Sequence, residues 1–306
     1  MGFRGPPVSP TKPPGTFRVI LLGGSTAVGY GTDDDATIDA YLRRMLAASF
    51  PGICVEVVNL ALGGYDSYQD YERMRVEGAR LDPDLVIIHS GINDVRNARY
   101  ADLSDPPDPR TLLWQGPLQE LRGPGGYSPN AWAVIKHYSY VARLPGFMRS
   151  LWGTRRDLAT IRATDAYPAA VDYFATNLER TIDLAVTGGA AVILSTPPSA
   201  LSFRNQPTDP VEKSYWIRDA VTTEDYRSRL EARMRKIARH EQETGRLVIH
   251  VSHRLRPEDF LDDAHLLGSG NEAVARGLRK AADPFVRGAL PLGSGGPHAC
   301  RSGASP

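Results

Sequence analysis

The chain has 306 residues, of which 42% are hydrophobic and 23% are charged, a composition typical of a globular protein with room for one large domain. Its 36 basic and 35 acidic residues nearly cancel, which argues against a nucleic-acid partner. No apolar run reaches the roughly 18 residues that a transmembrane segment needs. The two cysteines predict neither a disulfide nor a metal site, because Cys54 resembles a buried apolar side chain and Cys300 a stray thiol.

The two ends of the chain differ in composition from its middle. Residues 1–16 form a Pro-rich lead-in without the apolar core of a secretion signal, so the chain as written is expected to be cytoplasmic. An upstream segment missing from this sequence would leave export open. Residues 288–306 are rich in Gly, Ser and Pro and predict a disordered tail. Residues 17–287 are expected to form a single domain.

Short apolar runs alternate with helical patterns through this domain. Each run is rich in β-branched residues and nearly continuous in apolarity, which is typical of parallel strands covered on both faces. The five predicted strands are Phe17–Gly23, Val55–Leu62, Asp84–Ser90, Ala190–Thr196 and Arg246–Val251. The clearest helical patterns are Asp165–Val186 and Thr223–Thr244. This alternation predicts a doubly wound α/β sheet, in which ligands bind beyond the carboxyl ends of the strands.

The first predicted strand runs directly into the sequence GGSTAVGYG. A phosphate-binding P-loop is excluded because Tyr30 stands where the lysine must be, and a dinucleotide fingerprint is disfavoured because Ser25 or Thr26 replaces its second glycine. The G-x-S-x-G nucleophile elbow is incomplete, since Ala27 stands at its last position. Ser25 taken alone is therefore either a nucleophile or a residue that caps the following helix.

A carboxylate and a histidine near the other end of the chain favour the nucleophile. Asp262 and His265 are three residues apart, so a compact loop can bring the carboxylate onto the ring nitrogen that faces away from a nucleophile. With Ser25 they supply the three members of an acyl-transfer triad. The adjacent Asp263 is a competing candidate for the orienting carboxylate.

Two further predicted strand ends offer hydrogen-bond donors for an oxyanion. Gly64 in NLALGG has no side chain to obstruct its N–H, and the Asn93 side chain in GIND can donate from its amide. Read singly, Gly64 indicates a turn and Asn93 a helix cap. The neighbouring Asp94 is expected to hold its own loop by local hydrogen bonds.

Three more histidines, His89, His250 and His253, also lie near strand ends. None has a carboxylate at the same compact spacing within a motif. They are interpreted as packing or surface histidines.

The motifs that contain Ser25, Gly64, Asn93 and the Asp262–His265 pair together resemble the four motif blocks of the SGNH (GDSL-like) hydrolase family. GGST resembles its first block, with Gly24 in place of the usual aspartate, and NLALGG, GIND and DDAH resemble the other three in order and spacing. The resemblance implies a flavodoxin-like three-layer α/β/α sandwich with a five-stranded parallel sheet. It also implies Ser25 as nucleophile, His265 and Asp262 as its partners, and an oxyanion hole formed by the Ser25 N–H, Gly64 and Asn93.

Two segments fall outside the resemblance, about 100–164 and 197–222. They contain all four tryptophans and are expected to be helical or loop inserts over the active site that select the substrate or hold a satellite core. Residues 137–156 mix apolar and basic side chains, so a peripheral membrane or protein contact there stays an alternative.

The sequence therefore predicts a serine carboxylic-ester hydrolase of the esterase or deacetylase type that acts through an acyl-enzyme. Its substrate is expected to be a small-molecule or glycan ester, with no cofactor, no metal and no nucleic acid involved. An acyltransferase with the same triad is the first alternative, and a non-catalytic flavodoxin-like binding module is the second. The oligomeric state is left open.

Overall fold

A central parallel β-sheet organises the chain. The computed structural model describes residues 4–97, 166–200, 220–262 and 264–289. Its five strands are β1 (Thr16–Gly23), β2 (Cys54–Asn59), β3 (Leu85–His89), β4 (Ala191–Ser195) and β5 (Val248–Val251). They are all parallel and lie in the order β2-β1-β3-β4-β5. The five predicted strands are confirmed, with ends that shift by a few residues.

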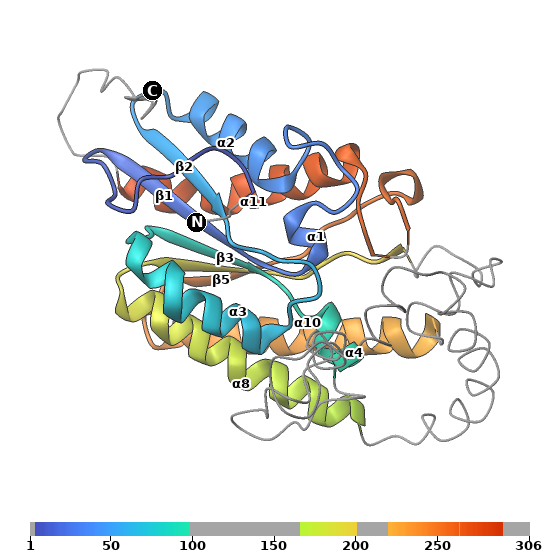
Figure 1. Cartoon of the computed structure of the whole chain (residues 1–306). Helices are drawn as coiled ribbons and strands as arrows, with labels where there is room; N and C mark the ends of the chain where they lie inside the picture. Colours follow the sequence, from blue (N-terminus) through green and yellow to red (C-terminus); the bar gives the residue numbers. More distant parts are fainter. Residues whose placement is uncertain (1–3, 98–165, 201–219, 263, 290–306) are drawn as a thin grey trace, which may run out of the picture.

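Helices cover both faces of this sheet and make a three-layer α/β/α sandwich (Figure 1). One face carries α2 (Ile38–Ser49) and α11 (Gly268–Gly288). The other carries α3 (Ser67–Arg73), α8 (Ala166–Thr187) and α10 (Ala220–Glu243). Shorter elements are α1 (Ser25–Val28), α4 (Ile92–Asn97), the π-helical turn η1 (Met74–Gly78) and the 3₁₀ turns η2 (Ala79–Leu81) and η5 (Pro257–Asp259). The predicted fold class is therefore confirmed.

The helices form where apolar residues recur every three or four positions. In α8, Phe174, Leu178 and Ile182 are all buried against the sheet. The long central strands carry apolar side chains on both faces because each face packs on a helical layer. Two hydrophobic cores result, one on each side of the sheet.

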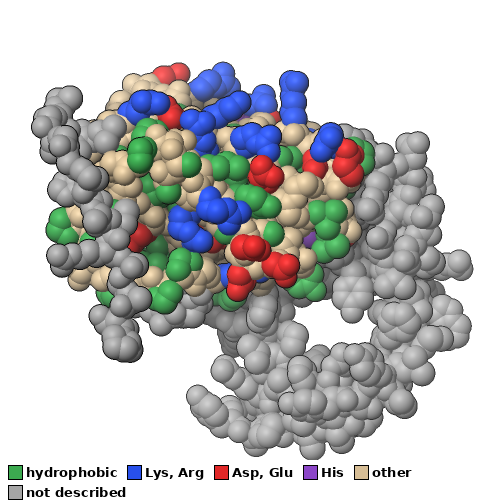
Figure 2. Space-filling view, turned by 90° about the horizontal axis from the view of Figure 1, so that it is seen from above, with side chains coloured by type: hydrophobic (Ala, Val, Ile, Leu, Met, Phe, Trp, Pro, Cys, Tyr) green, Lys and Arg blue, Asp and Glu red, His purple; other side chains and the backbone are tan. Residues whose placement is uncertain are grey.

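The outer face of the α2/α11 layer is polar. In the view from above, Lys and Arg side chains lie among Asp and Glu side chains on this face (Figure 2). Several of these charges pair along α11, as Arg276 does with Glu272 and Arg287 with Asp283. These exposed pairs solubilise the helix and add little stability.

The lead-in residues that the structure describes lie against this fold. Arg4 forms an isolated antiparallel bridge with Asn59 at the end of β2, and Val8 packs against the hydrophobic core that includes Phe174 of α8. Lys12 forms an ion pair with Asp84, just before β3, with 2.9 Å between Nζ and Oδ1. The segment thus contacts the carboxyl end of β2 and the residue that precedes β3. The domain limits at 17 and 287 stay predictions.

The structure also bears on the expectations for the cysteines, the two inserts and a membrane-spanning segment. Cys54 is disulfide-bonded, so its interpretation as an unpaired apolar side chain is wrong: a strand-like apolar context does not reveal a covalent partner. Cys300, residues 137–156 and most of the two predicted inserts lie outside the described residues. None of the described helices combines the length and the apolar composition needed to cross a membrane.

Candidate active site

Ser25 lies where β1 ends, at the carboxyl edge of the sheet. Gly23 makes this turn with φ of 149°, and a Cβ there would lie 2.2 Å from the His89 carbonyl oxygen of β3. Only glycine therefore lets the chain leave the sheet so close to its neighbour. Helix α1 starts at Ser25 with Gly24 as its N-cap and no side-chain cap. The alternative that Ser25 merely caps a helix is therefore wrong.

The Ser25 hydroxyl is hydrogen-bonded to His265. The distance from Ser25 Oγ to His265 Nε2 is 2.8 Å, and from His265 Nδ1 to Asp262 Oδ2 it is 2.7 Å. The structure thus brings together three side chains that lie up to 240 positions apart in the sequence. Asp263, the competing carboxylate, lies outside the described residues.

A small closed loop orients Asp262 and His265. Phe260 and Leu266 form an antiparallel bridge, and the Leu261 N–H donates to the His265 carbonyl at 2.9 Å. Inside the loop, Asp262 Oδ1 accepts the His265 N–H at 2.7 Å. The backbone of the loop thus holds the Asp262 carboxylate independently of its contact with the imidazole ring.

Hydrogen bonding keeps Asp262 charged. Partial burial alone would raise its pKa, but hydrogen bonds from the His265 ring and from the N–H groups of His265 and Ala264 lower the pKa to about 2. An ionised Asp262 accepts a hydrogen bond from the N–H at His265 Nδ1, which leaves Nε2 as the hydrogen-bond acceptor for the Ser25 hydroxyl.

Tyr30 lies against the His265 ring. The two ring centroids are 4.8 Å apart and the planes are tilted by 45°. In the sequence, Tyr30 only rules out a P-loop. The structure places it in the loop after α1 with its ring on the imidazole, and the sole feature of the sequence that could indicate this contact is an aromatic residue shortly after the serine.

Asn93 lies beside Gly24 and therefore beside Ser25. It is buried within α4, and its Nδ2 donates to the Tyr65 carbonyl at 2.8 Å. A Cβ at Gly24 would lie only 2.6 Å from Asn93 Nδ2. In this chain the amide occupies space that a side chain at position 24 would take.

Gly64 occupies the turn after β2 that faces the same edge. Leu62 at its start donates its N–H to the Gly23 carbonyl at 3.1 Å, and Tyr65 at its end accepts from Asn93. Gly64 adopts φ of 85°, a conformation that side chains disfavour. The turn thus lies between the segments that carry Ser25 and Asn93.

Asp94 binds the start of α3. It accepts hydrogen bonds from the N–H and the hydroxyl of Ser67. The expected hydrogen bonds within its own loop stay a prediction. Burial, with the charges of Asp66 and Asp70 adding to it, raises the pKa of Asp94 well above its usual value.

A second serine–histidine contact lies deeper in the sheet. Ser195 Oγ is 2.8 Å from both His89 Nδ1 and His253 Nε2. Ser195 and His89 are fully buried, and no described carboxylate hydrogen-bonds to His253. Burial lowers the pKa of His89 to about 3 and that of His253 to about 4. These neutral rings act as packing residues, as does His250 on Thr196.

A small cavity adjoins Ser25. About 10 Å³ of it admits the centre of a water molecule, which is room for about one water. It is lined by residues 24–26, Tyr65, residues 89–93, Pro197 and Ala264. Ser25 and Asn93 therefore share one cavity, and Pro197 brings the start of the second predicted insert to it. Within the described part of the chain, no group of three or more His, Cys, Asp or Glu side chains is placed to hold a metal ion.

Several solved structures are similar to this chain. A GDSL-like lipase from Bacteroides thetaiotaomicron is 16% identical, with 87% of this chain and 88% of that chain covered and a TM-score of 0.45. The esterase Axe2 from Geobacillus stearothermophilus, named an acetylxylan esterase, is 17% identical over 87% and 94% of the two chains, with a TM-score of 0.45. The enzyme LAE5 from the metagenome of Lake Arreo is 16% identical over 88% and 96%, with a TM-score of 0.48.

The sequence comparisons decide the family. No curated protein matches the chain. The sequence model of the GDSL-like lipase/acylhydrolase family matches residues 21–273, which include Ser25, Asn93 and the Asp262–His265 loop. Because this match covers most of the chain, the protein belongs to the GDSL-like lipase/acylhydrolase family of ester hydrolases.

Proposed function

We propose that this ester hydrolase cleaves carboxylic esters through an acyl-enzyme formed on Ser25. The observation that carries the proposal is the continuous hydrogen-bonded series from Ser25 Oγ through the His265 ring to Asp262. Ser25 is partly exposed, so an ester carbonyl can reach its hydroxyl. The Ser25 hydroxyl proton faces His265 Nε2, and the proton on His265 Nδ1 faces the Asp262 carboxylate.

Acylation follows from these positions. His265 Nε2 removes the Ser25 proton as Oγ attacks the ester carbonyl carbon, and Asp262 stabilises the imidazolium that forms. His265 then gives this proton to the departing alkoxide. The acyl group stays on Ser25 until a water, deprotonated in turn by His265, attacks its carbonyl carbon. The bond from that carbon to Ser25 Oγ then breaks, Oγ takes the proton back from His265, and the carboxylic acid leaves.

The tetrahedral oxyanion needs donors on the other side of the carbonyl. Asn93 Nδ2 carries two hydrogens and gives one to the Tyr65 carbonyl, which leaves the second for the oxyanion. The N–H groups of Ser25 and Gly64 complete the set in this proposal. Losing one such donor in other enzymes lowers kcat by roughly 10²–10³-fold.

The substrate is proposed to be a small-molecule or glycan ester carrying a short acyl group. The name of Axe2 as an acetylxylan esterase agrees with the glycan class, while the small cavity beside Ser25 favours an acyl group of few atoms. Transfer of the acyl group to an alcohol instead of water stays a prediction that depends on the inserts.

Labelling with a fluorophosphonate, followed by mass spectrometry of the intact protein, tests this proposal alongside p-nitrophenyl acetate turnover. We expect one label on Ser25, and loss of both label and turnover in Ser25→Ala and His265→Ala. Ser195→Ala is the matched control because Ser195 also contacts a histidine but is fully buried, so label and turnover are retained. A folded wild-type protein that neither labels nor turns over would overturn the proposal.

The orienting carboxylate is tested in the same assay. Asp262→Asn removes the charge that fixes the His265 tautomer, so kcat is expected to fall by about 10³-fold or more. Asp263→Asn is expected to keep near wild-type turnover. The reverse result would assign the carboxylate to Asp263.

A further inference from the structure

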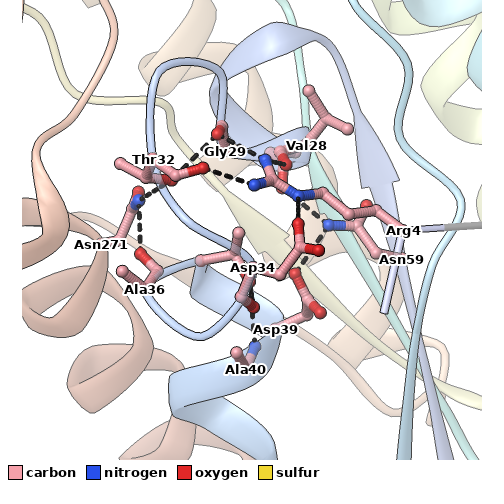
Figure 3. A network of polar contacts seen from close by, with 12 residues as sticks. Arg4, Val28, Gly29, Thr32, Asp34, Ala36, Asp39, Ala40, Asn59 and Asn271 are labelled. Atoms are coloured by element: carbon pink, nitrogen blue, oxygen red, sulfur yellow. Dashed lines mark hydrogen bonds and ion pairs between the residues drawn. The ribbon is translucent and has the colours of Figure 1, made fainter. Parts of the chain in front are cut away.

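The N-terminal segment reaches the loop that follows the proposed nucleophile. The Arg4 guanidinium donates to the carbonyl of Val28 at 2.8 Å, to that of Gly29 at 2.6 Å and to that of Thr32 (Figure 3). Its Nε donates to Asp34 at 2.8 Å. Arg4 thus contacts four residues of one loop and holds the carbonyl groups at the end of α1.

This loop depends on such external support. Gly29 and Gly31 adopt φ of 78° and 80°, and glycine at such angles is conformationally free in the absence of other contacts. Asn271 from α11 supports the far side by donating to the Ala36 carbonyl at 2.9 Å (Figure 3). Asn59 from β2 donates to the Ala27 carbonyl at 3.0 Å. Between Val28 and Thr32, Arg4 holds three carbonyl groups. Two local hydrogen bonds add to this support, from the Tyr30 N–H to the Ser25 carbonyl at 3.0 Å and from the Thr32 hydroxyl to the Gly29 carbonyl at 2.9 Å.

That stretch contains the residues that contact the site. Tyr30 lies on the His265 ring with the centroids 4.8 Å apart, although 61% of Tyr30 is exposed. A Cβ at Gly31 would lie 2.5 Å from Leu261 Cδ2, so the loop also touches the residue next to Asp262. The position of Tyr30 therefore depends on a backbone that Arg4 and the Ser25 carbonyl hold together, rather than on burial of its own ring.

We infer that Arg4 is a positioning residue for the ester hydrolase site, acting through Tyr30 to hold the His265 ring between Ser25 and Asp262. The inference rests on the proposed function of His265 as the general base. A guanidinium suits this task because its planar fork offers five N–H donors in fixed directions to several acceptors at once, whereas a lysine offers one charged point. Small errors in placing a catalytic group reduce kcat more than they reduce binding.

The test compares Arg4→Ala and Arg4→Lys with Lys12→Ala. Lys12 is the matched control, since it lies in the same segment and forms ion pairs with Asp82 and Asp84, away from the site. We expect Arg4→Ala to lower kcat for p-nitrophenyl acetate by about tenfold with less than about twofold change in KM. Arg4→Lys should recover only part of kcat, and Lys12→Ala should keep it. Guanidinium ion, at concentrations that do not unfold the protein, should partly restore Arg4→Ala.

A double-mutant cycle with Tyr30→Ala separates positioning from general stability. If Arg4 acts through Tyr30, replacing Arg4 causes little further loss of kcat once Tyr30→Ala is present. Two additive losses, or equal kcat in Arg4→Ala and Lys12→Ala, would overturn the inference. Ser25 labelling of the wild type is measured beside these variants. If the proposed function is wrong, the wild-type protein carries no label. If only this inference is wrong, Arg4→Ala is labelled and keeps its activity.

Discussion

At the scale of single residues, Gly24 shows how a missing side chain shapes the site. Its backbone has φ of −89°, which other residues adopt easily, so the requirement for glycine comes from the space around it. The Asn93 amide and the Tyr65 carbonyl lie 2.6 Å and 3.2 Å from where its Cβ would be. The size of the residue before Ser25 therefore limits how close the Asn93 amide, the proposed oxyanion donor, can lie.

We expect Gly24→Ala to lower kcat by about 10–100-fold, because the new methyl group displaces the Asn93 amide from the oxyanion position. KM should change much less. Gly52→Ala is the control, since nothing lies within 4 Å of its Cβ position. Steady-state kinetics with p-nitrophenyl acetate would check this, and an unchanged kcat in Gly24→Ala would argue against Asn93 as an oxyanion donor.

At the scale of elements, the loop between η5 and α11 sets the geometry of Asp262 and His265. Helix α11 closes this loop at its base, where a Cβ on Gly270 would lie 2.4 Å from the Asp259 carbonyl oxygen. The Leu267 N–H donates to the same carbonyl at 2.9 Å. The first turn of α11 therefore packs directly on the loop that carries two of the three proposed catalytic groups.

Gly270→Ala is expected to lower both stability and activity. The methyl group has to push Asp259 away, which costs about 1–3 kcal/mol in the free energy of unfolding and shifts the loop. Gly288→Ala, in the last position of the same helix with open space around it, should change neither quantity by much. Urea unfolding and turnover measured on both variants would check the expectation, and full turnover in a destabilised Gly270→Ala would show that the helix does not position the loop.

At the scale of the whole molecule, buried titratable groups make stability depend on pH. Burial lowers the pKa of His89 to about 3, below its usual value in an unfolded chain, so the unfolded state binds a proton that the folded state does not. The stability from neutral His89 is present above about pH 6.5 and is lost as the pH falls toward 3. Asp70 acts in the opposite direction, since burial raises its pKa to about 7 and its contribution is lost as the pH rises from about 4 to 7.

We expect His89→Gln to remove about 1.4 kcal/mol per pH unit from the slope of the unfolding free energy between pH 6 and pH 4.5. His240→Gln, at an exposed position on α10, is the control. Urea unfolding at several pH values measures the slope directly. If both variants keep the wild-type slope, His89 does not stay neutral in the folded protein.

Much of the fold could be predicted because it depends on local patterns. Parallel strands covered on both faces appear as continuous apolar runs, and α8 shows its buried face at three- and four-residue spacing, so both kinds of element were placed correctly. Asp94 shows the limit of local reasoning. Its partner Ser67 lies 27 positions away, and nothing in the residues around Asp94 indicates that α3 reaches it.

Side-chain periodicity and motif spacing are properties of short stretches, so they predict the α/β architecture, the family resemblance, and the candidate set of Ser25, Asp262, His265, Gly64 and Asn93. Three contacts are visible only in the folded protein: Asp262 on the His265 ring, Tyr30 on that same ring, and Arg4 on the loop that carries Tyr30. The physical reason is that these contacts join segments brought together by packing of the sheet and its helices. Such a contact produces no periodic pattern in the sequence around either residue.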